Sequence, residues 1–237
     1  MTVAILPKTG GHSGQTGRIA PVRPAGIRSR SQASERSQVV GFIDTDYTGV
    51  VNDLQGFPFR SGRLCLDLSA TLGGRYRGGV ERLGSTEDVR RWLRASGLCP
   101  RPASVKDHHV DAARGLREAI YRLAHPKKKP SAADVATVNR WAGLPPLAPK
   151  LAVDGTVHFR GSVEAALSTV ARDAIDLLTG PLARRIRECA RPDCSLLFVD
   201  ASRPGRRRWC SMERCGNRRK TAAYRRRKRN GSEAPEA

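Results

Sequence analysis

The feature of this sequence that most constrains its fold is a pair of cysteine motifs near the C-terminal end. Each motif has the spacing Cys-x4-Cys, and fifteen residues separate the two. Zinc imposes little geometric preference of its own, so four thiolates from two short turns can surround it tetrahedrally at about 2.3 Å. The spacing therefore predicts a metal site whose ligands are Cys189, Cys194, Cys210 and Cys215.

Two disulfides, four unrelated core thiols and an iron–sulfur cluster are the alternatives to a zinc site. Disulfides are disfavoured because the opening segment lacks the apolar stretch of a secretory signal. Two equal spacings this close together rarely arise by chance, and zinc is favoured over an iron–sulfur cluster. A site of four sulfurs has no open position for water, so the metal is expected to be structural. Cys65 and Cys99 are expected to be buried small hydrophobes.

The same segment carries most of the chain's positive charge. The net charge is +21, and residues 182–230 alone contain 17 basic and 4 acidic residues. Such a surplus favours a polyanionic partner. The basic run at 225–229 repels itself unless anions compensate, which favours nucleic acid over solubility alone. The sequence predicts a basic loop and a basic helix over about 212–229 as the nucleic-acid-binding surface, with contacts from Arg203, Arg206, Arg207, Arg208, Arg214, Arg218, Arg219, Arg225, Arg226 and Arg229.

The rest of the chain divides by composition and periodicity. Residues 1–60 are rich in Gly, Ser, Pro and Arg without apolar periodicity, which predicts a disordered N-terminal extension, and residues 231–237 are predicted to be a disordered tail. Residues 61–181 are predicted to form a helical domain and residues 182–230 a zinc finger. The expected fold class is mainly α, with one β-hairpin in the helical domain and a small four-cysteine finger of hairpin or knuckle plus helix.

Local signals set the expected helix boundaries. N-cap residues followed by an acidic residue three positions later predict helix starts at Ser85, Ser104 and Ser131, and Ser162 predicts a fourth. Asp154-Gly155 between two short apolar runs predicts the hairpin, with positive φ at both turn residues. Residues 64–68 fit a short strand or a buried helical turn equally well. Residues 182–188 are expected to restart a helical turn after the break at Gly180-Pro181.

The C-terminal stretch CARPDCSLLFVDASRPGRRRWCSMERCGNRRKTAAYRRR resembles the CGNR zinc-finger family, whose name matches the run from Cys215 to Arg218. In that family the finger follows a helical domain called ABATE, described as a stress-induced transcription regulator. Residues 63–181 are similar to that domain, with LCLDL, STEDVRRWL, LREAIYRLA, the Asp-Gly hairpin and DAIDLL in order. One departure is Ala70, which stands where members of the family commonly carry Asn.

The resemblance implies a DNA-binding transcription regulator. The chain has 35 Arg and only 8 Lys, which is typical of a GC-rich bacterial genome, and we expect a cytoplasmic, nucleoid-associated protein. No run approaches the roughly 18 apolar residues of a membrane span. The helical domain is expected to sense a signal, such as a small-molecule effector, or to mediate formation of a homodimer, since small DNA-binding modules usually use a second copy.

Two other functions are alternatives to a DNA-binding regulator. Composition does not separate DNA from RNA, so an RNA- or ribosome-associated zinc protein is the first alternative. A small-molecule enzyme with a site near Asp67 and Arg75 is the second, but no residues stand at catalytic spacing, so we expect neither an enzyme nor catalytic residues. The remaining polar residues are expected to have structural roles. His108-His109 is predicted to be an exposed or capping pair, and Lys127, Lys128 and Lys129 an exposed interhelix loop. Asn217 is predicted to cap the helix, with backbone pairing to the metal sulfurs and contact with adenine as the alternatives.

Overall fold

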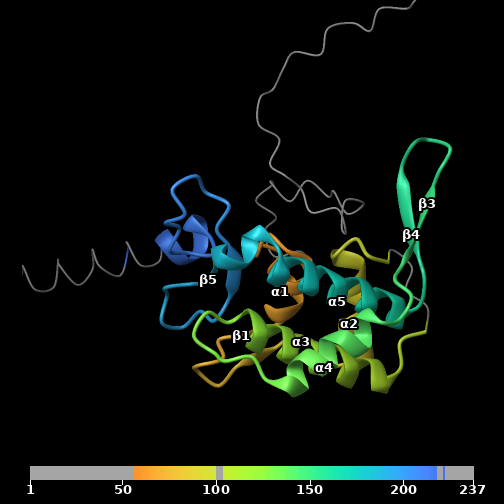
Figure 1. The fold of residues 1–237 in the computed structure, drawn as a ribbon, viewed down its shortest axis with the longest axis horizontal. Coiled ribbons are helices and arrows are strands. Elements are labelled where there is room, and N and C mark those ends of the chain that lie inside the picture. Colours follow the sequence, from red (N-terminus) through yellow and green to blue (C-terminus); the bar gives the residue numbers. More distant parts are fainter. Residues whose placement is uncertain (1–55, 100–103, 218–220, 222–237) are drawn as a thin grey trace, which may run out of the picture. The chain divides into compact units, whose positions relative to one another are not determined.

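The computed structural model describes residues 56–99, 104–217 and 221, all within one unit of the chain, residues 37–237 (Figure 1). Helices dominate this part, and its strands form only two-stranded sheets. The mainly α class predicted from the sequence is therefore confirmed. Among the described residues, no helix is both long and apolar enough to cross a membrane.

The helices begin mostly where the sequence predicts. Their bounds are α1 Leu64–Ser69, α2 Thr86–Ala95, α3 Asp107–Ala124, α4 Ala132–Ala142 and α5 Val163–Thr179. The side chains of Ser85, Ser131 and Ser162 accept the expected backbone hydrogen bonds, and Ser85 forms a full capping box with Asp88. Each cap satisfies a backbone N–H that the first helical turn leaves without a partner.

The start of α3 differs from the prediction. The helix begins at Asp107, and Ser104 lies three residues before it and does not cap it. Instead, Nδ1 of His109 accepts the backbone N–H of Lys106 at 2.9 Å. His109 is buried, so tertiary packing holds its ring against the helix start in a way that local sequence rules do not anticipate.

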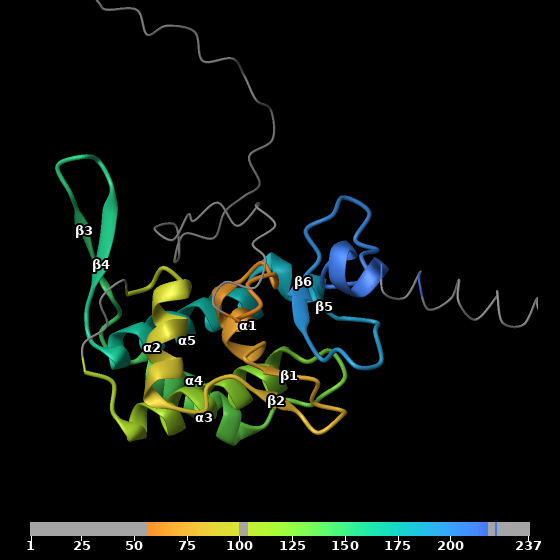
Figure 2. The ribbon, with the colours of Figure 1, turned by 180° about the vertical axis from the view of Figure 1, so that it is seen from behind.

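Helix α1 resolves the ambiguity of residues 64–68 in favour of a buried helical turn. All six of its residues are buried, and it contacts α3, α5 and β6 (Leu197–Val199) (Figures 1 and 2). Asp173 of α5 accepts the N–H of Cys65 at 2.8 Å and pairs with Arg63 at 2.7 Å. Burial raises the pKa of the Cys65 thiol, which fits its predicted role as a neutral core residue. Cys99 is buried as well.

The predicted hairpin is present and a second, smaller one accompanies it. Strands β3 (Ala148–Leu151) and β4 (Val157–Arg160) pair antiparallel and extend away from the helices (Figures 1 and 2). Ala152 donates to the carbonyl of Thr156, so three residues rather than two form the loop, with Gly155 at φ 81°. The sequence did not predict β1 (Leu72–Gly73) and β2 (Val80–Glu81), which are only two residues long each.

The segment after α5 matches the predicted helical turn only in its first part. A 3-10 turn, η1 (Pro181–Arg185), is followed by strand β5 (Ile186–Glu188), which pairs with β6. Ile186, Leu197 and Val199 are at most 5% exposed and belong to the same hydrophobic core as the five helices. The zinc module, as we call residues 182–230, of which 182–217 and 221 are described, therefore shares a core with the helical part.

The folded part also begins earlier than the sequence predicts. Phe57 and Phe59 are buried, and the ring of Phe59 stacks on Trp92 with the ring centroids 6.2 Å apart. Residues 57–59 are thus buried in the fold and are not part of a disordered extension. The predictions for residues 1–55 and 231–237 lie outside the described residues.

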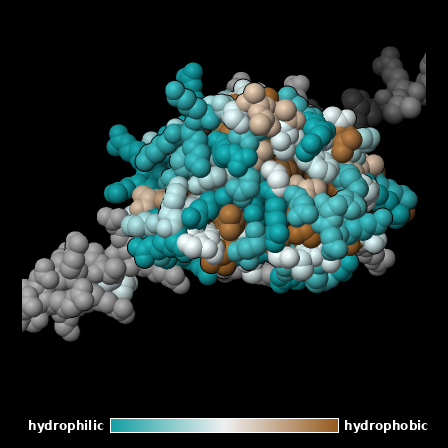
Figure 3. Space-filling view, turned by 90° about the horizontal axis from the view of Figure 1, so that it is seen from below, coloured by the Kyte–Doolittle hydropathy of each residue, from teal (hydrophilic) through white to brown (hydrophobic). Residues whose placement is uncertain are grey.

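On the face seen from below the view of Figure 1, hydrophilic residues predominate and hydrophobic ones are scattered (Figure 3).

Candidate metal centre and basic surface

Two local structures present the four cysteines. Cys189 directly follows β5, and its N–H continues the β5–β6 ladder by donating to Leu196 at 3.0 Å. Cys194 closes a tight turn by donating to the carbonyl of Arg191. The second pair lies around a short π-helical turn, η2 (Met212–Gly216). This turn contains Cys215, and one residue, Ser211, separates its start from Cys210. The centre therefore consists of a cysteine knuckle, residues 189–194, that faces the start of a helix.

Ser211 caps the start of η2, because its side chain accepts the N–H of Arg214. The sequence assigned this capping role to Asn217, but Asn217 has right-handed helical dihedrals (φ −66°, ψ −40°) and lies past the turn. The helical turn begins at Met212, five residues before Asn217, because residues 212–216 form a π-helical turn. Asn217 is thus not the cap of the helix start: it lies at the C-terminal end of η2, where its N–H donates to the carbonyl of Met212.

The sulfur atoms have the separations that a tetrahedral ion requires. All four lie within 4.8 Å of one another, with Cys210 Sγ 3.4 Å from Cys215 Sγ and 3.9 Å from Cys194 Sγ. Metal–sulfur bonds of about 2.3 Å give a tetrahedral edge of about 3.8 Å. The four sulfurs are too far apart for the roughly 2.05 Å bond of a disulfide, so the centre contains thiols and no disulfide. The structure thus brings the predicted ligands together.

The electrostatics of the cluster favour a cation. Hydrogen bonds from Cys194 and the other neighbouring thiols lower the pKa of Cys189, whereas donation to Cys189 raises the pKa of Cys210. Four crowded sulfurs therefore share protons and cannot all ionise unless a positive charge lies between them. Cys189, Cys210 and Cys215 are at most 4% exposed, so water does little of this compensation. An all-sulfur, buried, four-ligand set is the donor chemistry of structural zinc.

Arg191 supplies part of that positive charge and was missed by the sequence analysis. It lies between the first two ligands, and its guanidinium donates to Sγ of Cys215 at 3.9 Å while also pairing with Asp193. Groups that hydrogen-bond to metal ligands orient them and tune the metal affinity. A basic residue within the CARPDC run was the available signal.

A second cluster of potential ligands does not form a metal centre. His108, His109 and Glu164 come within 4.8 Å of one another, a proximity that only the tertiary structure creates. A neutral imidazole has one acceptor nitrogen, and in His109 this is Nδ1, which accepts the Lys106 N–H. Its Nε2 therefore carries the proton and donates to Glu164 Oε1 at 2.8 Å. The group is a hydrogen-bond chain at a helix start, in line with the predicted capping role.

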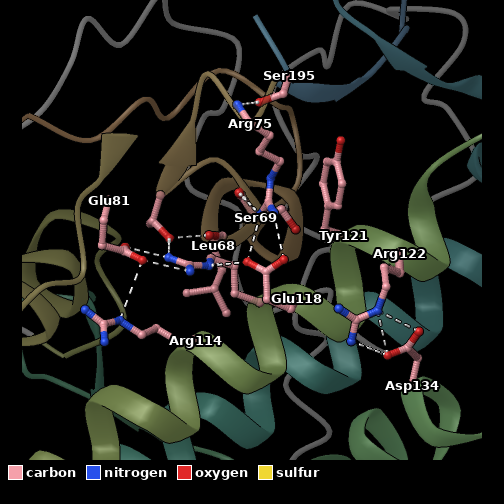
Figure 4. A network of polar contacts seen from close by, with 12 residues as sticks. Leu68, Ser69, Arg75, Glu81, Arg114, Glu118, Tyr121, Arg122, Asp134 and Ser195 are labelled. Carbon is pink, nitrogen blue, oxygen red and sulfur yellow. Dashed lines mark hydrogen bonds and ion pairs between the residues drawn. The ribbon is translucent and has the colours of Figure 1, made fainter. Parts of the chain in front are cut away.

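The metal cluster rests on the helical part of the chain. Ala70, which follows α1, packs in the same buried group as Cys189, Cys210 and Cys215. Ala70, which stands where the resemblance predicts Asn, therefore belongs to the buried group that contains the metal ligands. Figure 4 shows Arg75 between the two parts: its N–H donates to Ser195 of the zinc module at 3.1 Å, and its guanidinium pairs with Glu118 of α3.

These contacts also account for the two residues that the enzyme alternative invoked. Arg75 pairs with Glu118 and lies 3.8 Å from the centre of the Tyr121 ring. Asp67 is 1% exposed and accepts the N–H groups of Arg60 and Ser61 at 3.1 Å each. Both side chains hold the fold together.

A basic loop, residues 200–208, stands beside the metal centre in a fixed conformation. Asp200 is fully buried and accepts from Ser202 and from the N–H of Arg207. Burial alone would raise the pKa of Asp200, but these hydrogen bonds lower it. The guanidinium of Arg207 binds the carbonyls of Trp209 and Cys210 and lies over Phe198, so this arginine braces the loop.

The other predicted nucleic-acid contacts fall into two groups. Exposed and carried by the loop or by η2 are Arg203, Arg206, Arg208 and Arg214. Outside the described residues lie Arg218, Arg219, Arg225, Arg226 and Arg229, together with most of the predicted basic helix. Within the described residues, the predicted nucleic-acid-binding surface therefore consists of the basic loop and Arg214 of η2.

Fold and site together define a class of protein: a helical domain that carries a four-cysteine zinc finger. Residues 62–181 match the ABATE family, described as "Putative stress-induced transcription regulator", and residues 185–228 match the CGNR zinc finger. The first match spans half of the chain, so this protein belongs to the ABATE family, and Zn²⁺ is the cofactor that its cysteine centre fits. Neither family description names an enzyme. No curated protein matches the chain.

Proposed function

We propose that this protein is a zinc-dependent, DNA-binding transcription regulator. In this proposal the zinc module holds the DNA, and the helical domain senses a signal or mediates dimerisation. The family description supports the regulatory part, and the closed cysteine centre supports a structural role for zinc. The single observation that carries the DNA-binding part is the basic loop, which presents exposed arginines on a backbone held by hydrogen bonds beside the cysteine centre.

Rigidity matters because it lowers the entropic cost of binding. The loop is fixed internally by Asp200 and Arg207, and its carbonyl at Arg208 accepts the N–H of Ala190 in the cysteine knuckle at 2.8 Å. Arg203 and Arg206 are left exposed on this base. An arginine fork binds a phosphate, or both acceptors of a guanine edge, through two parallel hydrogen bonds.

A salt titration of DNA affinity tests the proposal. The zinc-loaded full chain is titrated into a short fluorescent duplex at several salt concentrations, with anisotropy as the signal. Each neutralised phosphate contributes about 0.9 to the slope of log affinity against log salt, so the double variant Arg203→Gln/Arg206→Gln should lower that slope by about 2. The matched control is Lys150→Gln/Arg160→Gln on the distant hairpin, which removes the same charge and should leave the slope unchanged.

Two outcomes would overturn the proposal. Affinity for duplex DNA that does not fall with salt would remove the electrostatic basis of the interface. Tighter binding of a structured RNA than of the duplex, at the same salt concentration, would support an RNA- or ribosome-associated role instead.

The β3–β4 hairpin supports the dimerisation part of the proposal. Side chains alternate between its faces, which places Leu151 and Val157 opposite each other on one face and Lys150 and His158 on the other. Leu151 is 72% exposed and Val157 43% exposed, so the apolar face has no cover at its outer end. Leu151→Ser/Val157→Ser should convert a dimer to a monomer in sedimentation, whereas Lys150→Gln/Arg160→Gln should not. A chain that is monomeric before substitution would remove this part.

A further inference from the structure

A cleft of about 340 Å³ lies between the helical part and the zinc module. Tyr76, His125 and Lys127 line it from the helical side. The cysteine knuckle lines it from the other side, with Glu188, Ala190, Arg191, Pro192 and two of the metal ligands. The loop between α3 and α4, which the sequence marked only as exposed, therefore lies beside the metal centre.

That loop presents three consecutive lysines in an ordered conformation. The N–H of Lys127 donates to Nδ1 of His125, and the N–H of Lys128 donates to the carbonyl of His125. The ammonium of Lys128 lies 5.1 Å from the centre of the Tyr121 ring. All three lysines are exposed, and within the described part of the chain no ion pair joins their ammonium groups to a carboxylate.

The acidic groups around the cleft are already hydrogen-bonded or ion-paired within the fold. Glu188 accepts a hydrogen bond from the hydroxyl of Tyr76 and pairs with Nε2 of His125 at 3.3 Å. Asp193, in the knuckle, is held by Arg191. Three lysines against the single carboxylate of Glu188 leave this region with a positive surplus, which Lys127, Lys128 and Lys129 carry.

The lysine loop and the basic loop of the zinc module both neighbour Ala190 of the cysteine knuckle. Ala190, which lines the cleft with Lys127, donates its N–H to the carbonyl of Arg208 at 2.8 Å. The knuckle thus has exposed arginines on one side and exposed lysines on the other. A polymer with regularly spaced negative charges is the chemistry that can satisfy both groups at once.

We propose that Lys127 and Lys129 form a second phosphate-binding anchor, on the helical domain, for the same DNA that the zinc module holds. This inference rests on the proposed function. Contact with both parts places the DNA across the junction between them, so a change in the helical domain that moves the lysine loop alters DNA affinity directly.

The test compares two pairs of substitutions in the zinc-loaded full chain. Lys127→Gln/Lys129→Gln removes the anchor and leaves Lys128, which packs on Tyr121. The control Lys150→Gln/Arg160→Gln removes the same charge from the hairpin. For the anchor pair we expect the salt slope of duplex affinity to fall by about 2 and the affinity to fall about tenfold or more, equally for all duplex sequences. The control pair should change neither.

A second measurement does not depend on the variants. Chemical acetylation of the wild-type chain, read by mass spectrometry, should be suppressed by bound duplex at Lys127 and Lys129 but not at Lys150. A wild-type chain that binds the duplex while the anchor pair keeps its slope, or while both pairs lose affinity equally, would overturn this inference alone. A wild-type chain that does not bind duplex DNA would overturn the proposed function and the inference with it.

Discussion

Removing the zinc should destabilise the helical domain as well as the zinc module. The knuckle that holds Cys189 and Cys194 connects β5 to β6, and these strands place Ile186, Leu197 and Val199 in the helical core at 5%, 1% and 5% exposure. Burial of each such side chain is worth about 1.5–3 kcal/mol, so complete detachment of the sheet costs up to about 5–9 kcal/mol. Structural zinc sites bind with about 10–16 kcal/mol, enough to supply this.

Thermal unfolding with and without a zinc chelator measures the effect. Far-ultraviolet circular dichroism follows the helices, and tryptophan fluorescence in a Trp209→Phe variant follows the helical core, where Trp92 is 1% exposed. For a chain of this size each kcal/mol shifts Tm by about 2–4 °C, so a loss of about 5 kcal/mol lowers Tm by about 10–20 °C. Both signals should shift together, and added zinc should restore them.

Two variants separate zinc binding from thiol chemistry in general. Cys210→Ser should lower the Tm and abolish its dependence on zinc, whereas Cys65→Ala, at a buried thiol outside the centre, should keep that dependence. Coupling through the shared core is refuted if chelation removes the metal while the helical signal melts within about 2 °C of its original Tm.

Three further predictions concern single side chains. Ser85→Ala should cost about 1 kcal/mol in urea unfolding because it removes the α2 capping box, whereas Ser104→Ala should cost nothing, and equal costs would contradict the observed start of α3. Arg191→Gln should weaken zinc about 10- to 100-fold in chelator competition, and unchanged affinity would show that its contact with the ligand sulfur does not matter. Hydrogen bonds from Ser162, its own backbone and a histidine lower the pKa of Glu164 from 4.5 to about 2. Because the pKa of Glu164 is lower in the folded state, this carboxylate stabilises the fold above about pH 4.5 and loses its contribution as the pH falls towards 2. Glu164→Gln should therefore flatten the dependence of unfolding free energy on pH between about 4.5 and 2. An unaltered pH dependence would count against the lowered pKa.

The sequence by itself determined the features that depend on neighbours a few residues apart. The caps at Ser85, Ser131 and Ser162, the hairpin at Gly155 and the spacing of the cysteine pairs all follow from local stereochemistry and ligand geometry. The cysteine pattern was informative because two turns and one ion satisfy it almost regardless of the surrounding fold.

Only the tertiary structure decided the features that depend on packing between distant segments. Residues 64–68 became a helix because burial on all sides favours a turn whose backbone groups bond within itself. His109 replaced Ser104 at the start of α3. Strand β5 replaced the second part of the predicted helical turn, where Ile186 joins the helical core. The proximity of the lysine loop to the cysteine knuckle also depends on packing between distant segments. Local periodicity reports which face of an element is apolar, but burial and charge are set by the partner that covers it, and that partner is chosen by the whole fold.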